Sequence, residues 1–120
     1  MTETPRIVAD SADFDRPPQA SGSAWRLDPP QRDLDANIIT LIPGDTIDRH
    51  TGPALDVLIH VISGSGVLAT DDEEIELSPG AVVWLPRRTT RAFTAGGNGL
   101  SYLSVHQRKP GLSIGTAPPQ

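Results

Sequence analysis

The fold is decided by two stretches of similar layout, Gly44-Asp45-Thr46-Ile47-Asp48-Arg49-His50 and Gly80-Ala81-Val82-Val83-Trp84-Leu85-Pro86. Each begins at a glycine and has five residues before its last position, which is a histidine in the first stretch and a proline in the second. The triplet Gly64-Ser65-Gly66 lies between them and predicts a hairpin turn. Glycine and proline at these positions indicate short strands joined by tight turns.

Short apolar segments continue this pattern on both sides of the two stretches. In Glu74-Ile75-Glu76-Leu77 apolar and acidic residues alternate, so Ile75 and Leu77 are expected to point inward. No segment has a sustained helical period. We therefore predict an all-β fold, a jelly roll whose two sheets close over one core. The predicted strands are residues 36–42, 55–62, 67–70, 74–77, 82–85, 91–94 and 100–106.

Composition agrees with this class of fold. The chain has 120 residues, enough for one domain with a single core, and 37% of them are hydrophobic. Twelve prolines and eleven glycines are typical of a β-rich, turn-rich domain, because helices tolerate few of these residues. The domain is expected to span residues 25–110, between a flexible N-terminal arm at 1–24 and a flexible tail at 111–120.

Net charge and amino-acid composition narrow the kinds of partner and of chemistry that the protein can have. The net charge of −5 argues against nucleic acid, which requires a clustered excess of Lys and Arg. Residues 81–120 nevertheless contain basic residues and no acid, which leaves room for a small anion. Without cysteine there is no disulfide or thiolate chemistry. No apolar run approaches the roughly 20 residues of a membrane span and no signal pattern is present, so we expect a cytoplasmic protein with no membrane partner.

The two glycine-led stretches, with the later positions that follow them, resemble the two signature motifs of the cupin superfamily. The resemblance covers roughly Asn37 to His106 and implies a jelly-roll β-barrel. In small cupins it also implies a homodimer in which an N-terminal arm crosses to the neighbouring subunit. Ile7-Val8-Ala9 and the region of Trp25 are the candidates for such an arm.

The same resemblance implies a metal held by three histidines and a glutamate in the barrel, yet most of these ligands are missing. His50 occupies the first position, whereas Gly52 and Arg91 occupy the other two histidine positions. The glutamate position falls on Val57 or its neighbour Asp56. A glycine offers no side-chain donor, and a guanidinium stays protonated and repels a cation. By this interpretation the metal site is degenerate and no cofactor is expected.

The alternative interpretation is that the donors have moved. A β-bulge near Gly52 could bring Asp56 inward, and a divalent zinc, iron, nickel or manganese ion would then be held by an unusual ligand set. Strand alternation does not decide which face of residues 55–62 lines the barrel. Otherwise the histidines form hydrogen bonds or lie at a dimer interface, and His60 is expected to be buried among apolar neighbours. The candidate metal ligands are His50, Asp56, His60 and His106.

Arg91 is the sharpest departure from the family pattern. At a position that should face the cavity, a guanidinium favours a carboxylate, phosphate or enolate, which it can bind through two parallel hydrogen bonds. The alternative is that Arg87, Arg88 and Arg91 form a solvated loop cluster. For Trp84 and Tyr102 core packing is the first interpretation, and a pocket wall is the second. The candidate ligand-binding residues are His50, Arg91, Trp84, Tyr102 and His106.

Three functions remain open at this point. The first is binding of a small polar or anionic organic molecule in the barrel. The second is a metal-dependent cupin enzyme, either an oxygenase, an isomerase or a cyclase, with rearranged ligands. The third is a regulatory or partner-binding module that acts through the two tails. The fold cannot choose among them, because one scaffold hosts many functions.

Overall fold

Two long strands organise the structure, a computed structural model that describes residues 4–108. They are β4 (Val57–Ala69) and β7 (Thr90–Gln107), which pair with each other antiparallel along most of their lengths. One half of each strand belongs to one sheet, and the other half belongs to the second sheet. The described residues also include one short 3-10 helix, η1 (Ser11–Phe14). The predicted all-β fold is therefore confirmed, while the tail at 111–120 lies outside the described residues.

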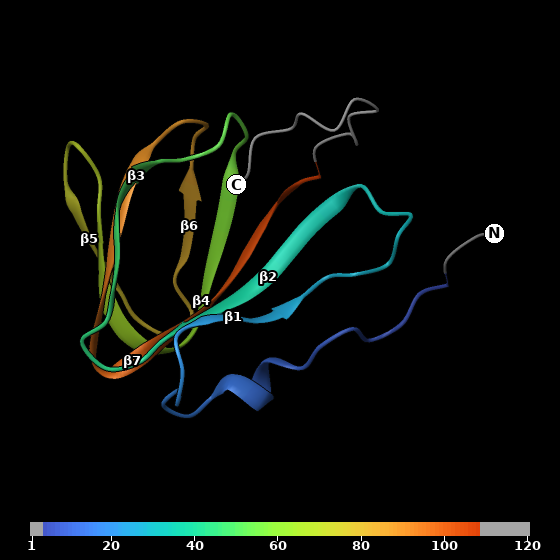
Figure 1. Cartoon of the computed structure of the whole chain (residues 1–120), viewed down its shortest axis with the longest axis horizontal. Coiled ribbons are helices and arrows are strands. Elements are labelled where there is room, and N and C mark those ends of the chain that lie inside the picture. Colours follow the sequence, from blue (N-terminus) through green and yellow to red (C-terminus); the bar gives the residue numbers. More distant parts are fainter. Residues whose placement is uncertain (1–3, 109–120) are drawn as a thin grey trace.

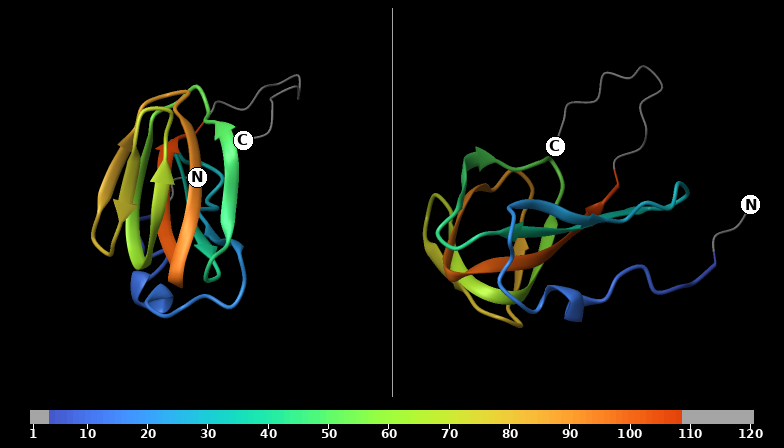
Figure 2. Two further views of the ribbon diagram at one scale, coloured as in Figure 1. Left: turned by 90° about the vertical axis from the view of Figure 1, so that its left-hand side faces the viewer. Right: turned by 60° about the horizontal axis from the view of Figure 1, so that its bottom comes forward.

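The shorter strands complete the two sheets (Figure 1). The first sheet has the order β1-β2-β7-β4-β6, with β1 (Gly22–Arg26), β2 (Leu34–Leu41) and β6 (Val82–Leu85). The second has the order β3-β7-β4-β5, with β3 (Thr46–Thr51) and β5 (Glu74–Leu77), and its strands lie side by side in the left view of Figure 2. This is the predicted jelly roll. None of the described residues forms a helix of the length and hydropathy that crossing a bilayer requires.

The core lies between the sheets and follows the period-two alternation of the strands. In β4, Val57, Ile59 and Val61 are buried, whereas Leu58 and His60 between them are exposed. Leu68, from the other half of β4, and Leu100 of β7 are fully buried in the same cluster. In β5, Leu77 is buried and Ile75 packs against the core, as the alternation predicted. The inner face of β4 is therefore the apolar one.

The hairpin turn predicted at Gly64-Ser65-Gly66 is wrong, because this triplet lies inside β4. The apolar segment 91–94 likewise does not stop at Ala95-Gly96-Gly97 but continues through β7. The glycines mark register shifts where the pair of strands passes from one sheet to the other. Gly64 has φ 79°, and a Cβ there would lie 2.1 Å from the Gly99 carbonyl oxygen. Glycine here allows two backbones to approach, and no reversal of the chain is involved.

We predict that Gly64→Ala destabilises the fold by roughly 2–4 kcal/mol, from a disfavoured φ and a backbone clash. Gly97→Ala is the matched control in the same region, because nothing lies within 4 Å of its Cβ position and its φ needs no glycine. Urea unfolding of the three proteins measures the difference. Equal midpoints for Gly64→Ala and Gly97→Ala would show that the crossing tolerates a side chain.

The N-terminal arm passes β4, which η1 contacts, and its first described residues extend away from the barrel (Figures 1 and 2). Two side chains of the barrel hold its backbone: Ser63 Oγ donates to the Phe14 carbonyl at 2.5 Å, and Thr40 Oγ1 donates to the Ala20 carbonyl at 2.8 Å. Ser21 accepts from the Ile42 amide at 3.0 Å and donates to the Asp45 carboxylate. The second half of the predicted arm is therefore attached to its own barrel.

The Ser21–Asp45 contact makes part of this attachment pH-dependent. Hydrogen bonds from the Ser21 hydroxyl and the Thr46 amide lower the pKa of Asp45 below its ordinary value of 3.8. A carboxyl whose pKa is lower in the folded protein stabilises the fold above that ordinary value, and this contribution is lost as the pH falls through the folded pKa. We predict that Ser21→Ala raises the pKa of Asp45, measured by NMR titration of its side-chain carboxyl. An unchanged titration would show that Ser21 does not bind the carboxylate in solution.

The outer face of the first sheet is apolar and exposed. Leu58 and Trp84 are register partners there, Val82 lies on the same face, and Trp84 and Val82 are each 62% exposed. The start of the arm is also apolar and unpacked, with Ile7 89% exposed. Exposed apolar patches of this kind often mark protein–protein contacts. The homodimer expected from the resemblance stays a prediction, and a second copy would cover both features.

Sedimentation equilibrium tests the dimer. We predict twice the mass of the chain for the wild type and a dissociation constant raised at least roughly tenfold by Trp84→Lys, because a charge would replace apolar contact area. Glu76→Lys, on an exposed position of β5, is the control for added charge. A monomeric wild type at all concentrations would contradict the prediction.

Candidate ligand-binding site

A cavity of about 350 Å³ opens inside the barrel, between the two sheets. Apolar side chains line much of it, from β2, β3, β4 and β7 and from the loop after β3. The polar lining residues are Asn37, His50, Arg91, Tyr102, Ser104 and His106, and the apolar ones are Ile39, Ile47, Pro53, Val57, Ile59 and Phe93. No carboxylate is among them. Four of the five predicted ligand-binding residues therefore meet in one cavity, and Trp84 does not.

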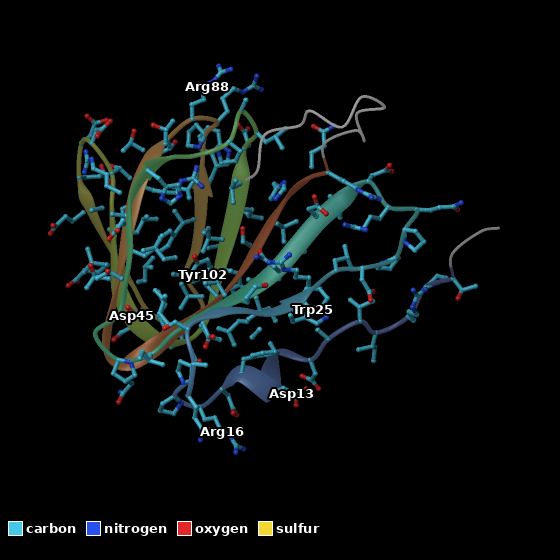
Figure 3. The ribbon with its side chains drawn as sticks, viewed as in Figure 1. Asp13, Arg16, Trp25, Asp45, Arg88 and Tyr102 are labelled. Carbon is cyan, nitrogen blue, oxygen red and sulfur yellow. The ribbon has the colours of Figure 1, made fainter. Side chains whose placement is uncertain are left out.

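Arg91 is the central cation of this cavity. It lies in β7 opposite His50 of β3 and is only 5% exposed. Its Nε donates to the Thr89 carbonyl at 3.2 Å, while Nη2 is buried with no hydrogen-bond partner among the described residues. Arg87 and Arg88 are exposed, and Arg88 points away from the barrel (Figure 3). Arg91 therefore does not belong to a solvated loop cluster with them.

Gly52 makes room for the Arg91 side chain. A Cβ on Gly52 would lie 2.1 Å from Arg91 Nη2 and 2.4 Å from its Cζ, closer than atoms can approach. Gly52 is itself buried, and its amide donates to the Thr89 carbonyl at 3.0 Å, the same oxygen that Arg91 Nε binds. Any side chain at position 52 would displace the guanidinium. Gly52 and Arg91, which stand at two of the family's histidine positions, therefore depend on each other: the glycine leaves the space that the arginine side chain fills.

Burial shifts the pKa of two cavity residues. It lowers the pKa of Arg91, and the nearby Tyr102 partly opposes this shift. Burial raises the pKa of Tyr102, and the positive charge of Arg91 opposes the increase. The phenol therefore stays protonated at neutral pH and can donate a hydrogen bond. Tyr102 lies between the sheets (Figure 3), and its ring stacks on Phe93 with centroids 4.9 Å apart.

Two histidines line the more open part of the cavity. Nδ1 of His50 lies 2.8 Å from the Asp48 carbonyl oxygen, and Nδ1 of His106 lies 2.8 Å from the Gln107 carbonyl oxygen. Since a carbonyl oxygen only accepts, each Nδ1 carries a hydrogen. Nε2 is then the atom that each ring has available for a ligand.

The four candidate metal ligands do not come together. His50 and His106 line the cavity, whereas Asp56 and His60 are exposed, because β4 turns Val57 and Ile59 inward. Asp56 instead accepts from the Trp84 indole at 3.3 Å and from the Arg87 amide at 2.9 Å. The expectation that His60 is buried is wrong for the same reason of strand parity.

The residues present do not fit a metal ion. Nowhere in residues 4–108 do three His, Asp or Glu side chains group closely enough to hold one. Inside the barrel, Val57 offers no donor, and the Arg91 guanidinium fills the space beside Gly52. A fixed cation at that place opposes binding of a second cation. The side chains that line this cavity therefore do not form a metal centre.

Sequence reasoning missed several residues of the cavity. Asn37 and Ser104 are register partners on β2 and β7, and they add two polar groups next to His106. Alternation along β7 could have identified Ser104, because Tyr102, Ser104 and His106 share one face of the strand. Ile47 was missed because β3 was not predicted, and its mostly polar sequence hides the single inward apolar residue.

Fold and cavity together define a small jelly-roll barrel protein with an interior cavity. The family model of the Cupin domain matches residues 37–106, more than half of the chain. The chain belongs to the cupin family. The comparison with curated proteins found no match.

Solved structures share the same barrel. A conserved protein of unknown function from Streptococcus pyogenes has a TM-score of 0.69 at 22% identity, over 92% of this chain and 93% of that one. A cupin superfamily protein from Desulfitobacterium hafniense has a TM-score of 0.69 at 18% identity, over 89% and 94%. A sugar phosphate isomerase of the cupin superfamily from Silicibacter pomeroyi has a TM-score of 0.60 at 22% identity, over 68% and 54%. At these identities the likeness shows the fold alone.

Proposed function

We propose that the barrel binds a small organic anion, whose acidic group pairs with Arg91. One observation carries the proposal: Arg91 lines the cavity, is almost fully buried, and has Nη2 without a partner among the described residues. A buried donor left unpaired costs about 1–3 kcal/mol, and more when it is charged. An anionic ligand in the cavity would supply the negative charge that the buried guanidinium lacks.

The charges around the cavity support an anion in preference to a neutral molecule. Among the described residues the lining contains a guanidinium and two imidazoles and no carboxylate. The arginine is held by Thr89 and given space by Gly52, so it is fixed before a ligand arrives. A guanidinium that is already in place binds a carboxylate or a phosphate at little cost in ordering.

The structural relatives include a protein with an anionic substrate by name. The sugar phosphate isomerase from Silicibacter pomeroyi shares the barrel, and by its name it acts on an organic anion. The metal-dependent alternative has less support, because the donors do not converge in the cavity. We therefore assign Arg91 as the anion-binding residue of a binding site and assign no catalytic group.

Isothermal titration calorimetry tests the proposal with four probes: benzoate, gluconate, glucose 6-phosphate and inorganic phosphate. At least one should bind the wild type and lose roughly a hundredfold or more in affinity in Arg91→Met, since one charge-assisted pair is removed. Arg88→Met, which removes an exposed arginine near the cavity, should leave binding unchanged. If no probe shows affinity that depends on Arg91, the proposal is wrong.

A further inference from the structure

The buried part of the cavity lining is mostly apolar. Val57, Ile59, Phe93, Tyr102 and Arg91 are buried, and they form the inner part. The more exposed part is mixed. Its polar residues are Asn37, His50, Ser104 and His106, and its apolar residues are Ile39, Ile47 and Pro53. A ligand that reaches Arg91 therefore places the rest of its body among apolar side chains before it meets another polar group, apart from the Tyr102 phenol.

This distribution excludes a ligand with many hydroxyl groups. Each hydroxyl placed against Val57 or Ile59 would lose its water and gain no protein partner, which costs about 1–3 kcal/mol per group. An apolar body of the same size gains from the same contact, at about 25 cal/mol for each Å² removed from water. The stacked rings of Phe93 and Tyr102, which are tilted by only 8°, add flat apolar surface.

The charge of the inner part selects a carboxylate over a phosphate. Arg91 is the permanent cation of the cavity, and a single carboxylate matches its charge. A phosphate monoester carries close to two negative charges at neutral pH and three acceptor oxygens. Beyond Arg91, the buried part of the lining offers only the Tyr102 phenol as a donor side chain, so a phosphate would keep unpaired oxygens.

From these features, and resting on the proposed function, we infer the ligand class: an apolar monocarboxylate with a compact aryl or branched-alkyl body. Its carboxylate pairs with Arg91, and its body packs on Val57, Ile59 and Phe93. The cavity volume of about 350 Å³ suits a molecule of this size, because it lies at the lower end of the range for small-molecule sites.

The ranking of affinities within the same four probes tests the inference separately from the proposed function. Benzoate should bind at least roughly tenfold more tightly than gluconate, glucose 6-phosphate or phosphate, which corresponds to about 1.4 kcal/mol. A polar probe that binds more tightly than benzoate, and still depends on Arg91, would overturn the inference and leave the proposed function intact. If no probe depends on Arg91, both are wrong.

A change in the apolar part provides a second test. Val57→Thr keeps the shape of the side chain and adds a hydroxyl beside the ligand body, so benzoate should lose roughly five- to tenfold in affinity. Val82→Thr makes the same exchange on the exposed outer face and should leave benzoate binding unchanged. Circular dichroism and melting temperature verify that both variants fold. Equal benzoate affinity in the two folded variants would place the ligand body elsewhere and overturn the inference.

Discussion

Arg91→Met is expected to unfold at a higher temperature than the wild type while it loses anion binding. The wild-type barrel keeps a guanidinium away from water with one nitrogen unpaired among the described residues. Methionine has a similar length, contacts the apolar lining well and leaves no donor unsatisfied. We expect the free energy of unfolding without ligand to rise by roughly 1–3 kcal/mol, measured by urea denaturation.

Two control variants separate the charge from the shape of the side chain. Arg91→Lys keeps a buried cation, loses the two-pronged geometry and should therefore bind the anion weakly without gaining stability. Arg88→Met removes a surface arginine and should change stability by less than about 0.5 kcal/mol. A loss of stability in Arg91→Met, at least as large as the loss in Arg91→Lys, would mean that Arg91 supports the fold through Thr89 and is not maintained for a ligand.

The sequence predicts strands best where a strand has one buried and one exposed face. The segment 74–77 alternates apolar and acidic residues, and β5 has these bounds. The crossing of β4 and β7 could not be predicted in this way, because glycine at a bulge and glycine at a turn give the same local signal. Only the pairing partner distinguishes them, and the partner of Gly64 is Leu100, far along the chain.

The same distinction applies to the candidate site: some of its features can be predicted from the sequence, and others depend on contacts between residues far apart in the chain. The resemblance to the family motifs predicted that His50 and Arg91 both face the cavity. They line it as register partners on β3 and β7, a pairing that the sequence did not predict. Strand parity near residue 57 was not decided by the sequence, since both alternating sets of 55–62 contain apolar residues. The role of Gly52 depends on a contact with the side chain of Arg91, far along the chain, and no local pattern encodes such a contact.

Restoring donors at three positions is expected to create a metal site in this barrel. The variant combines Gly52→His, Val57→Glu and Arg91→His with the natural His50. His50 and position 91 are register partners, position 52 lies directly against the side chain at 91, and Val57 lines the same cavity. The three changes remove the repelling guanidinium and supply two imidazoles and a carboxylate, ligands that suit zinc and nickel.

Elemental analysis and a melting-temperature shift on metal addition measure the gain. The triple variant should contain about one zinc or nickel ion per chain and be stabilised by about 2.7 kcal/mol when free metal is a hundredfold above its dissociation constant. Adding His50→Ala should abolish the gain. Adding Asp56→Ala and His60→Ala should leave metal binding by the triple variant unchanged, because these side chains point out of the barrel. Failure of the folded triple variant to bind metal would show that the four positions do not converge on one point. The wild type, in which Arg91 fills this space, should show no stabilisation by either ion.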